Sequence, residues 1–171
     1  MNKTQSGRAG ELALALYGLV TSDGRLELFT PVADDDHIDL IAGLHGGLPA
    51  LGIQVKATDA LDKNGLVEAR ASYPKGQVRD DPAFLYSVLL LQSVAIRAAW
   101  VVPSGDFNRL AYRAAGARRE TLEFRASPDR DDRFARFRVD PLRLGPVLVA
   151  RIEATPADAP PQWLLALCPS S

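Results

Sequence analysis

The sequence predicts an α/β domain of the α+β type, in which helices pack on a central mixed β-sheet. Three observations predict this class. A helical pattern opens the chain, three or four short apolar segments follow it as strands, and further helical and strand patterns come after them. The chain has 171 residues, 47% of them hydrophobic and 24% charged, which suits one domain with a full hydrophobic core.

The first element is expected to be a helix over residues 8–19. Leu12, Leu16 and Leu19 recur at i, i+4 and i+7, so we expect them to form the face that packs on the core. The strands that follow are expected at residues 26–30, 38–42, 52–58 and 66–73. A glycine-rich segment separates the second strand from the third, which predicts that these two strands pair as a hairpin.

A second helix is indicated by Asp81 and Pro82, because an acidic cap followed by proline at the first helical position favours a helix start. We expect this helix to cover residues 82–93. The later elements are expected as a strand at 98–102, a helix at 106–115, strands at 121–125 and 134–139, and a helix at 146–152. Residues 1–155 are expected to form the domain, and residues 156–171 a proline-rich linker with an apolar tail.

Composition narrows the class of protein. A single cysteine, Cys168, leaves no disulfide within the chain and argues against a cysteine-based zinc site, so the reducing cytoplasm is the expected location. The longest apolar stretch, residues 84–100, is too short and too polar to span a membrane. Residues 1–90 carry 8 Lys and Arg against 12 Asp and Glu, whereas residues 91–171 carry 12 Arg against 9 acids. This asymmetry fits a metal site beside a phosphate-binding flank, and a solvated surface of mixed charge is the simpler explanation.

The most informative residues for chemistry lie in the third strand. Side chains alternate along a strand, so Gln54 and Lys56 share one face while two apolar residues share the other. Asp39 stands within the second apolar strand, where a carboxylate is costly to bury unless it is paired or binds a cation. If the two strands pair as a hairpin, Asp39 and Gln54 approach each other.

Three segments of the chain resemble motifs of the PD-(D/E)XK nuclease superfamily, which includes restriction endonucleases and Holliday junction resolvases. They are GRAGE at residues 7–11, Pro31-Val32 followed by IDLI at 38–41, and GIQVKAT at 52–58. The resemblance covers residues 7–58 well and residues 66–104 loosely, and it does not extend beyond residue 104. In this sequence glutamine replaces the acidic residue of the (D/E)XK strand, so the variant is QXK.

The resemblance implies metal-dependent hydrolysis of phosphodiester bonds in DNA. It makes Asp39 the principal ligand of Mg²⁺ or Mn²⁺, completed by the side-chain carbonyl of Gln54 and the main-chain carbonyl of Val55. It makes Lys56 the group that orients the attacking water and neutralises charge at the phosphate. Glu11 would bind through a water or hold a second metal. The neutral amide of Gln54 lowers the negative charge of the site, which should weaken metal binding.

Simpler interpretations stand beside these. Glu11 alone is more often a solvated helix residue, and Lys56 alone is more often a charge at a strand edge. The nucleic-acid contacts we expect are Lys75, Arg79, Arg109 and Arg113, with surface loops as the simpler explanation. Two further functions remain open: a non-catalytic binding module that keeps the nuclease fold, and a role in protein assembly, such as a homodimer, through the apolar tail.

Overall fold

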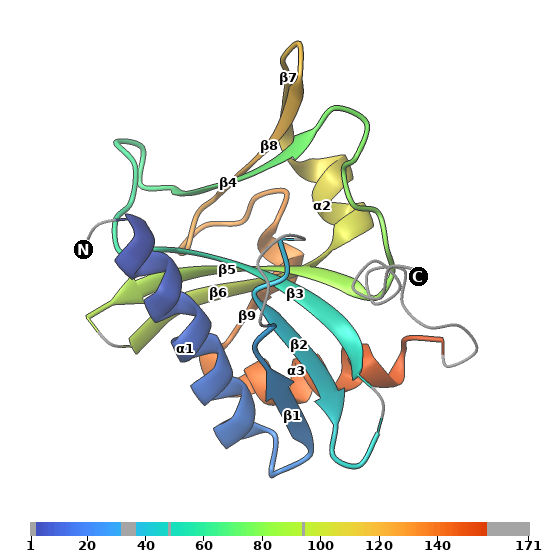
Figure 1. The fold of residues 1–171 in the computed structure, drawn as a ribbon. Helices are drawn as coiled ribbons and strands as arrows, with labels where there is room; N and C mark the ends of the chain where they lie inside the picture. The colour runs from blue at the N-terminus through green and yellow to red at the C-terminus, as the bar shows by residue number, and fades with distance from the viewer. Residues whose placement is uncertain (1–2, 32–36, 48, 94, 157–171) are drawn as a thin grey trace.

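The computed structural model describes residues 3–31, 37–47, 49–93 and 95–156. It contains a six-stranded sheet in the order β1-β2-β3-β5-β6-β9 and a three-stranded sheet in the order β4-β8-β7. The larger sheet is mixed, because β3 and β5 run parallel whereas its other neighbouring strands run antiparallel. The α+β class with a central mixed sheet is thus confirmed, and the smaller second sheet is an addition to it (Figure 1).

The elements in chain order have the following bounds. They are α1 (Lys3–Thr21), β1 (Leu26–Phe29), β2 (Leu40–Leu44), β3 (Pro49–Thr58), β4 (Val67–Pro74), β5 (Phe84–Gln92), β6 (Ala95–Pro103), α2 (Ser104–Leu110), β7 (Tyr112–Ala115), β8 (Arg119–Ala126), β9 (Arg138–Val139) and α3 (Leu144–Glu153). Single 3-10 turns at Ala135–Phe137 and Pro141–Arg143 precede β9 and α3.

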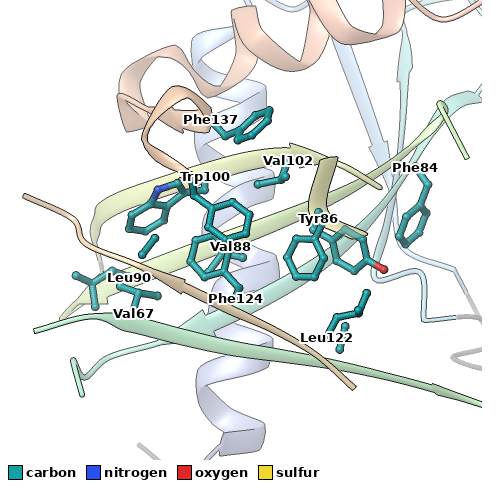
Figure 2. Packing of buried hydrophobic residues seen from close by; sticks show 14 of the residues in the cluster. Val67, Phe84, Tyr86, Val88, Leu90, Trp100, Val102, Leu122, Phe124 and Phe137 are labelled. Carbon is teal, nitrogen blue, oxygen red and sulfur yellow. The ribbon is translucent and has the colours of Figure 1, made fainter. Parts of the chain in front are cut away.

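Two hydrophobic layers cover the two faces of the larger sheet. One layer lies between this sheet and α1 with α3, and it includes Leu14 and Leu148. The other lies between the larger sheet and the smaller one, and Figure 2 shows Val88, Trp100 and Phe124 gathered there. The central strand β5 is therefore covered on both sides, and its first eight residues are all buried.

The helix expected over residues 82–93 is wrong, because this segment forms the strand β5. Asp81 does cap the backbone, since its Oδ1 accepts a hydrogen bond from the Ala83 N–H at 2.8 Å. However, the turn it stabilises leads into a strand, and Ser104 Oγ fixes the turn by donating to the Asp81 carbonyl at 2.7 Å. A strand buried on both faces is a continuous apolar run, which periodicity cannot distinguish from a buried helix.

The expected apolar face of the first helix is also wrong, although the helix itself is confirmed. Leu12, Leu16 and Leu19 are exposed by 59%, 60% and 43%. The face against the sheet consists instead of small residues and one leucine at four-residue spacing: Ser6, Gly10, Leu14 and Gly18. Small side chains let the helix backbone approach the sheet closely, and a hydrophobicity pattern gives such residues little weight.

Most of the remaining secondary-structure predictions are confirmed, and two of them are wrong. The strands expected at 26–30, 38–42, 52–58, 66–73, 98–102 and 121–125 and the helix at 146–152 are found with small shifts of their ends. The helix expected to residue 115 ends at Leu110 and is followed by β7. Of the strand expected at 134–139, half is a 3-10 turn and only residues 138–139 form the strand β9. The linker and apolar tail fall almost wholly outside the described residues. None of the described helices is both long enough and apolar enough to cross a membrane.

Candidate functional site

The hairpin of β2 and β3 brings Asp39 to the main chain of Val55. The two strands pair antiparallel with Leu40 opposite Ile53, and Asp39 precedes the first residue of β2. Its N–H donates to the Ile53 carbonyl at 2.9 Å, and its Oδ2 accepts from the Val55 N–H at 2.6 Å. The Asp39 carboxylate thus adds one more hydrogen bond between the two strands just before β2 begins, directly beside Gln54.

Gln54 lies on the face of β3 that is covered by the smaller sheet, and only 2% of it is exposed. Its Oε1 accepts a hydrogen bond from the Tyr73 hydroxyl at 3.1 Å, and that hydroxyl lies 2.6 Å from the hydroxyl of Tyr86. These contacts satisfy a carbonyl that would be costly to bury alone. The alternation predicted for this strand holds, since Ile53 and Val55 pack on the opposite layer.

Lys56 follows on the same face as Gln54, and it is half-buried. It borders a cavity of about 630 Å³ at the point where β3 ends and β4 begins. The lining includes Ser6 of α1, residues 56–62 and residues 68–70. One wall is held by Asp62, whose carboxylate accepts from the Leu66 N–H at 2.8 Å, and this bond lowers the pKa of Asp62. The cavity offers space for a ligand beside the Lys56 side chain.

Glu11 lies in α1, which packs on the Val55 and Ala57 face of β3, opposite to the face that carries Gln54 and Lys56. A Cβ atom built on Gly10 would lie 2.3 Å from the Cβ of Ala57, so only glycine permits this approach. Ala57 directly follows Lys56 in β3, and Glu11 directly follows Gly10 in α1. The Glu11 side chain is one-fifth exposed, and its carboxylate accepts from Arg8 Nη1 at 2.5 Å. Its observed partner is thus a neighbour on its own helix.

The donor set fits a hard divalent cation. A carboxylate, an amide carbonyl and a main-chain carbonyl are oxygen ligands of the type that Mg²⁺ and Mn²⁺ accept. Among the described residues, however, no group of three His, Cys, Asp or Glu side chains lies close enough together to hold a metal ion. A cation here would therefore depend on Gln54, on the main chain of Val55, on water and on the phosphate of a substrate.

Three of the four residues expected to contact nucleic acid lie around α2, because its Asn108 donates to the Arg79 carbonyl at 2.8 Å and accepts from Arg113 Nη2 at 3.5 Å. Lys75 is exposed in the turn after β4, and the guanidinium of Arg79 lies 4.7 Å from the centre of the Phe84 ring. Arg109 and Arg113 were expected on one helix, but Arg109 lies in α2 and Arg113 in β7. Both of these arginines form ion pairs, with Asp106 and Glu120 respectively.

Sequence reasoning missed a cationic cleft at the edge of the larger sheet. Its volume is about 440 Å³, and its lining includes the four arginines 136, 138, 143 and 151 with one acidic residue, Asp140. Arg143 and Arg151 make no ion pair with any residue the structure describes. Together with Val147 they recur at i, i+4 and i+8, but Arg143 precedes the helix expected at 146–152, so that prediction did not place the two arginines on one face.

Sequence reasoning also missed the two tyrosines beside Gln54, of which Tyr73 bonds its carbonyl and Tyr86 contacts Tyr73. Tyr86 stood in a segment interpreted as a helix, so no pattern could place it opposite Tyr73. Only the pairing of β3 with β5, which sets Gln54 opposite Tyr86, brings these side chains together.

The fold is shared with a known nuclease. The solved structure of a bacterial homing endonuclease, I-Ssp6803I, matches 90% of this chain and 99% of its own, with a TM-score of 0.59 and 16% sequence identity. At this identity the match establishes a nuclease-like fold. The sequence itself matches no protein-family model and no curated protein.

Proposed function

We propose that this protein is a metal-dependent phosphodiesterase of the PD-(D/E)XK type that cleaves DNA endonucleolytically. The observation that carries the proposal is the carboxylate of Asp39, bonded to the Val55 N–H at 2.6 Å directly beside Gln54. Lys56 follows on the same face of the strand and borders the cavity. The fold shared with a homing endonuclease supports the same class of reaction.

Each residue has a distinct part in the proposed reaction. Asp39 and the carbonyl groups of Gln54 and Val55 would hold Mg²⁺ or Mn²⁺, and Glu11 would contribute through a water. When bound, the cation supplies Lewis-acid stabilisation of the charge that develops on the phosphate. The Lys56 ammonium orients the attacking water and offsets negative charge on the phosphoryl oxygens. Its half-buried position strengthens that interaction relative to one in bulk water.

Cationic groups elsewhere on the molecule suit a long phosphate backbone. Lys75 is exposed, and Arg143 and Arg151 face the cleft without ion-pair partners among the described residues. Arg143 directly precedes α3 and Arg151 lies eight positions later within it, which corresponds to roughly 12 Å along the helix axis. That length covers three or so phosphates of one DNA strand, at about 3.4 Å of axial rise each. A DNA duplex fits this spacing better than a small phosphate ester does.

The direct test is cleavage of plasmid and branched DNA with Mg²⁺ or Mn²⁺. Asp39→Asn keeps an oxygen for the Val55 N–H and removes the charge, and Lys56→Ala removes the ammonium. Each should lower the cleavage rate by roughly 10²–10³-fold or more. Lys63→Ala is the matched control, because Lys63 is an exposed lysine in the loop after β3. Equal cleavage by the wild type and both site variants would refute the proposal and indicate a contaminating nuclease.

A second candidate is a DNA-binding module without catalysis. It is favoured by the burial of Gln54 and by the engagement of its carbonyl with Tyr73. This candidate expects salt-sensitive DNA binding and no turnover with any divalent cation. Metal-dependent cleavage that disappears in Lys56→Ala would exclude it.

A further inference from the structure

Cationic side chains gather at one end of the smaller sheet, where the turn after β4 meets the hairpin between β7 and β8. The Lys75 N–H donates to the Arg118 carbonyl at 3.1 Å, and Arg119 begins β8. All three residues are exposed, and none of them forms an ion pair with a residue that the structure describes. Three positive charges thus lie together on a chain whose net charge is −1. We call residues 74–77 and 112–119 the cationic tip.

The other end of the same sheet carries charges that cancel. On the face turned away from the larger sheet, Arg125 bonds both Glu68 and Glu123. Arg70 lies 3.4 Å from the carboxylate of Glu123. Two arginines and two glutamates leave no net charge there, so a polyanion is attracted to the cationic tip and not to the sheet as a whole.

The hairpin in the cationic tip is a narrow, uncovered ribbon. Strand β7 is the edge of its sheet, and residues 112–119 are exposed without interruption. Residues 114–117 are alanines and a glycine, which keep the ribbon slim. Figure 1 shows the hairpin extending away from the larger sheet. The major groove of B-DNA, about 12 Å wide, admits a two-stranded ribbon of this kind, whereas the minor groove is only about 6 Å wide.

Side-chain contacts hold the ribbon in shape before any ligand arrives. Arg119 donates from Nε to Ser72 Oγ at 3.0 Å and from Nη2 to the Ser72 carbonyl at 2.7 Å. Arg113 pairs with Glu120 across the two strands at 2.6 Å. A guanidinium has five N–H donors, so Arg119 is fixed by two of them and keeps three for a ligand. Binding therefore costs little ordering of this side chain.

The cationic tip lies at the end of β4 that contacts the candidate site. Tyr73, which bonds Gln54 Oε1 at 3.1 Å, is the second-to-last residue of β4. Lys75 follows two positions later, about 7 Å along an extended chain. A duplex with one phosphate at Asp39 therefore passes close to the cationic tip.

We propose that the cationic tip enters the major groove of DNA and is the element by which this protein reads base sequence. The inference rests on the proposed function for its substrate and adds the surface that selects among DNA sequences. Lys75 and Arg118 neutralise phosphates at the groove edge, and the remaining N–H groups of Arg119 meet base edges. Guanine O6 and N7 are the usual acceptors for arginine in this groove.

The test compares two duplexes of one sequence that differ only in the major groove. The sequence is selected by the wild type from a random duplex library in EDTA, and the second duplex carries a glucosylated hydroxymethyl group at C5 of every cytosine. C5 of a pyrimidine faces the major groove, so the sugar obstructs that groove and leaves the phosphates unchanged. Fluorescence anisotropy should give a roughly 5–150-fold lower affinity for the modified duplex, the loss expected for about one bidentate base contact.

The variants assign this difference to the cationic tip. Arg118→Gln with Arg119→Gln should remove most of the difference between the duplexes. Lys75→Gln with Arg118→Gln leaves the contact between Arg119 and Ser72 intact and should act in the same direction, which excludes a loosened hairpin as the cause. Arg70→Gln with Arg97→Gln is the matched control, because it removes the same charge from two exposed arginines that are ion-paired elsewhere. Thermal unfolding confirms that each variant is folded.

The outcomes separate this inference from the proposed function. Equal binding of the two duplexes by the wild type refutes entry into the major groove, and an unchanged difference in Arg118→Gln with Arg119→Gln refutes the role of the cationic tip. Equal loss in the control variant also refutes it. A wild type that discriminates between the duplexes but cleaves neither with Mg²⁺ or Mn²⁺ refutes the proposed catalysis and supports the inference. One that cleaves both equally refutes the inference alone, and one that binds neither duplex refutes both.

Discussion

Replacing Gly10 by alanine tests the close contact that sets α1 against β3. A methyl group at residue 10 would lie 2.3 Å from the Cβ of Ala57, and the backbone of β3 limits how far Ala57 can move. Overpacking of this kind costs about 1–3 kcal/mol. An alanine in a helix also gains about 0.5–1 kcal/mol over glycine, so the effect of contact must be separated from helix propensity.

Gly7 of the same helix isolates the effect of helix propensity, because a Cβ there would have no atom within 4 Å and hence no contact to strain. Gly7→Ala should stabilise the protein by about 0.5–1 kcal/mol. The propensity gain cancels between the two variants, so Gly10→Ala should be about 1–3 kcal/mol less stable than Gly7→Ala. For a chain of this length the difference corresponds to roughly 2–12 °C in Tm.

Urea denaturation and thermal unfolding of both variants measure this difference. A further variant, Gly10→Ala with Ala57→Gly, removes the opposing methyl group and should recover most of the lost stability. If Gly10→Ala is as stable as Gly7→Ala, the helix does not press on the strand at this point. The close packing of α1 against the end of β3 would then lose its structural basis.

Two further predictions concern the tyrosine pair and the cationic cleft. Because burial raises the pKa of Tyr73 and Tyr86, the folded state keeps protons that the unfolded state releases above about pH 10. These two tyrosines should therefore leave the free energy of unfolding unchanged up to that pH and then lower it by about 1.4 kcal/mol per pH unit each. Tyrosinate absorbance near pH 10 from all the tyrosines of the folded protein would contradict this. Replacing both Arg143 and Arg151 by glutamine should reduce the salt dependence of DNA binding by about 1.8 in the slope of log K against log salt. Fluorescence anisotropy measures the slope, with Arg97→Gln as the control because Arg97 is ion-paired with Asp129, and an unchanged slope would exclude the cleft from the DNA path.

Two errors of sequence interpretation have the same physical origin. The segment that became β5 is apolar on every side because hydrophobic layers cover both of its faces, so its pattern carried no period. The face of α1 was misassigned because Gly10 and Gly18 contact the sheet through backbone, whereas Leu12 and Leu16 remain exposed. In each case, burial was decided by elements distant in the chain.

The sequence by itself determined the local arrangement of the candidate site. Alternation along one strand put Gln54 and Lys56 on the same face, and a short hairpin brought Asp39 to the main chain of Val55. Both features follow from the period of a strand and from a connection of a few residues. They do not depend on the rest of the fold.

Only the tertiary structure decided what surrounds that arrangement. It buried Gln54 under a second sheet and supplied the hydroxyl of Tyr73 from β4, nineteen positions along the chain. It also placed α1 across β3 at Gly10. The physical reason is that burial and hydrogen-bond partners depend on which segments pack together, and that pairing is settled by the free energy of the whole core.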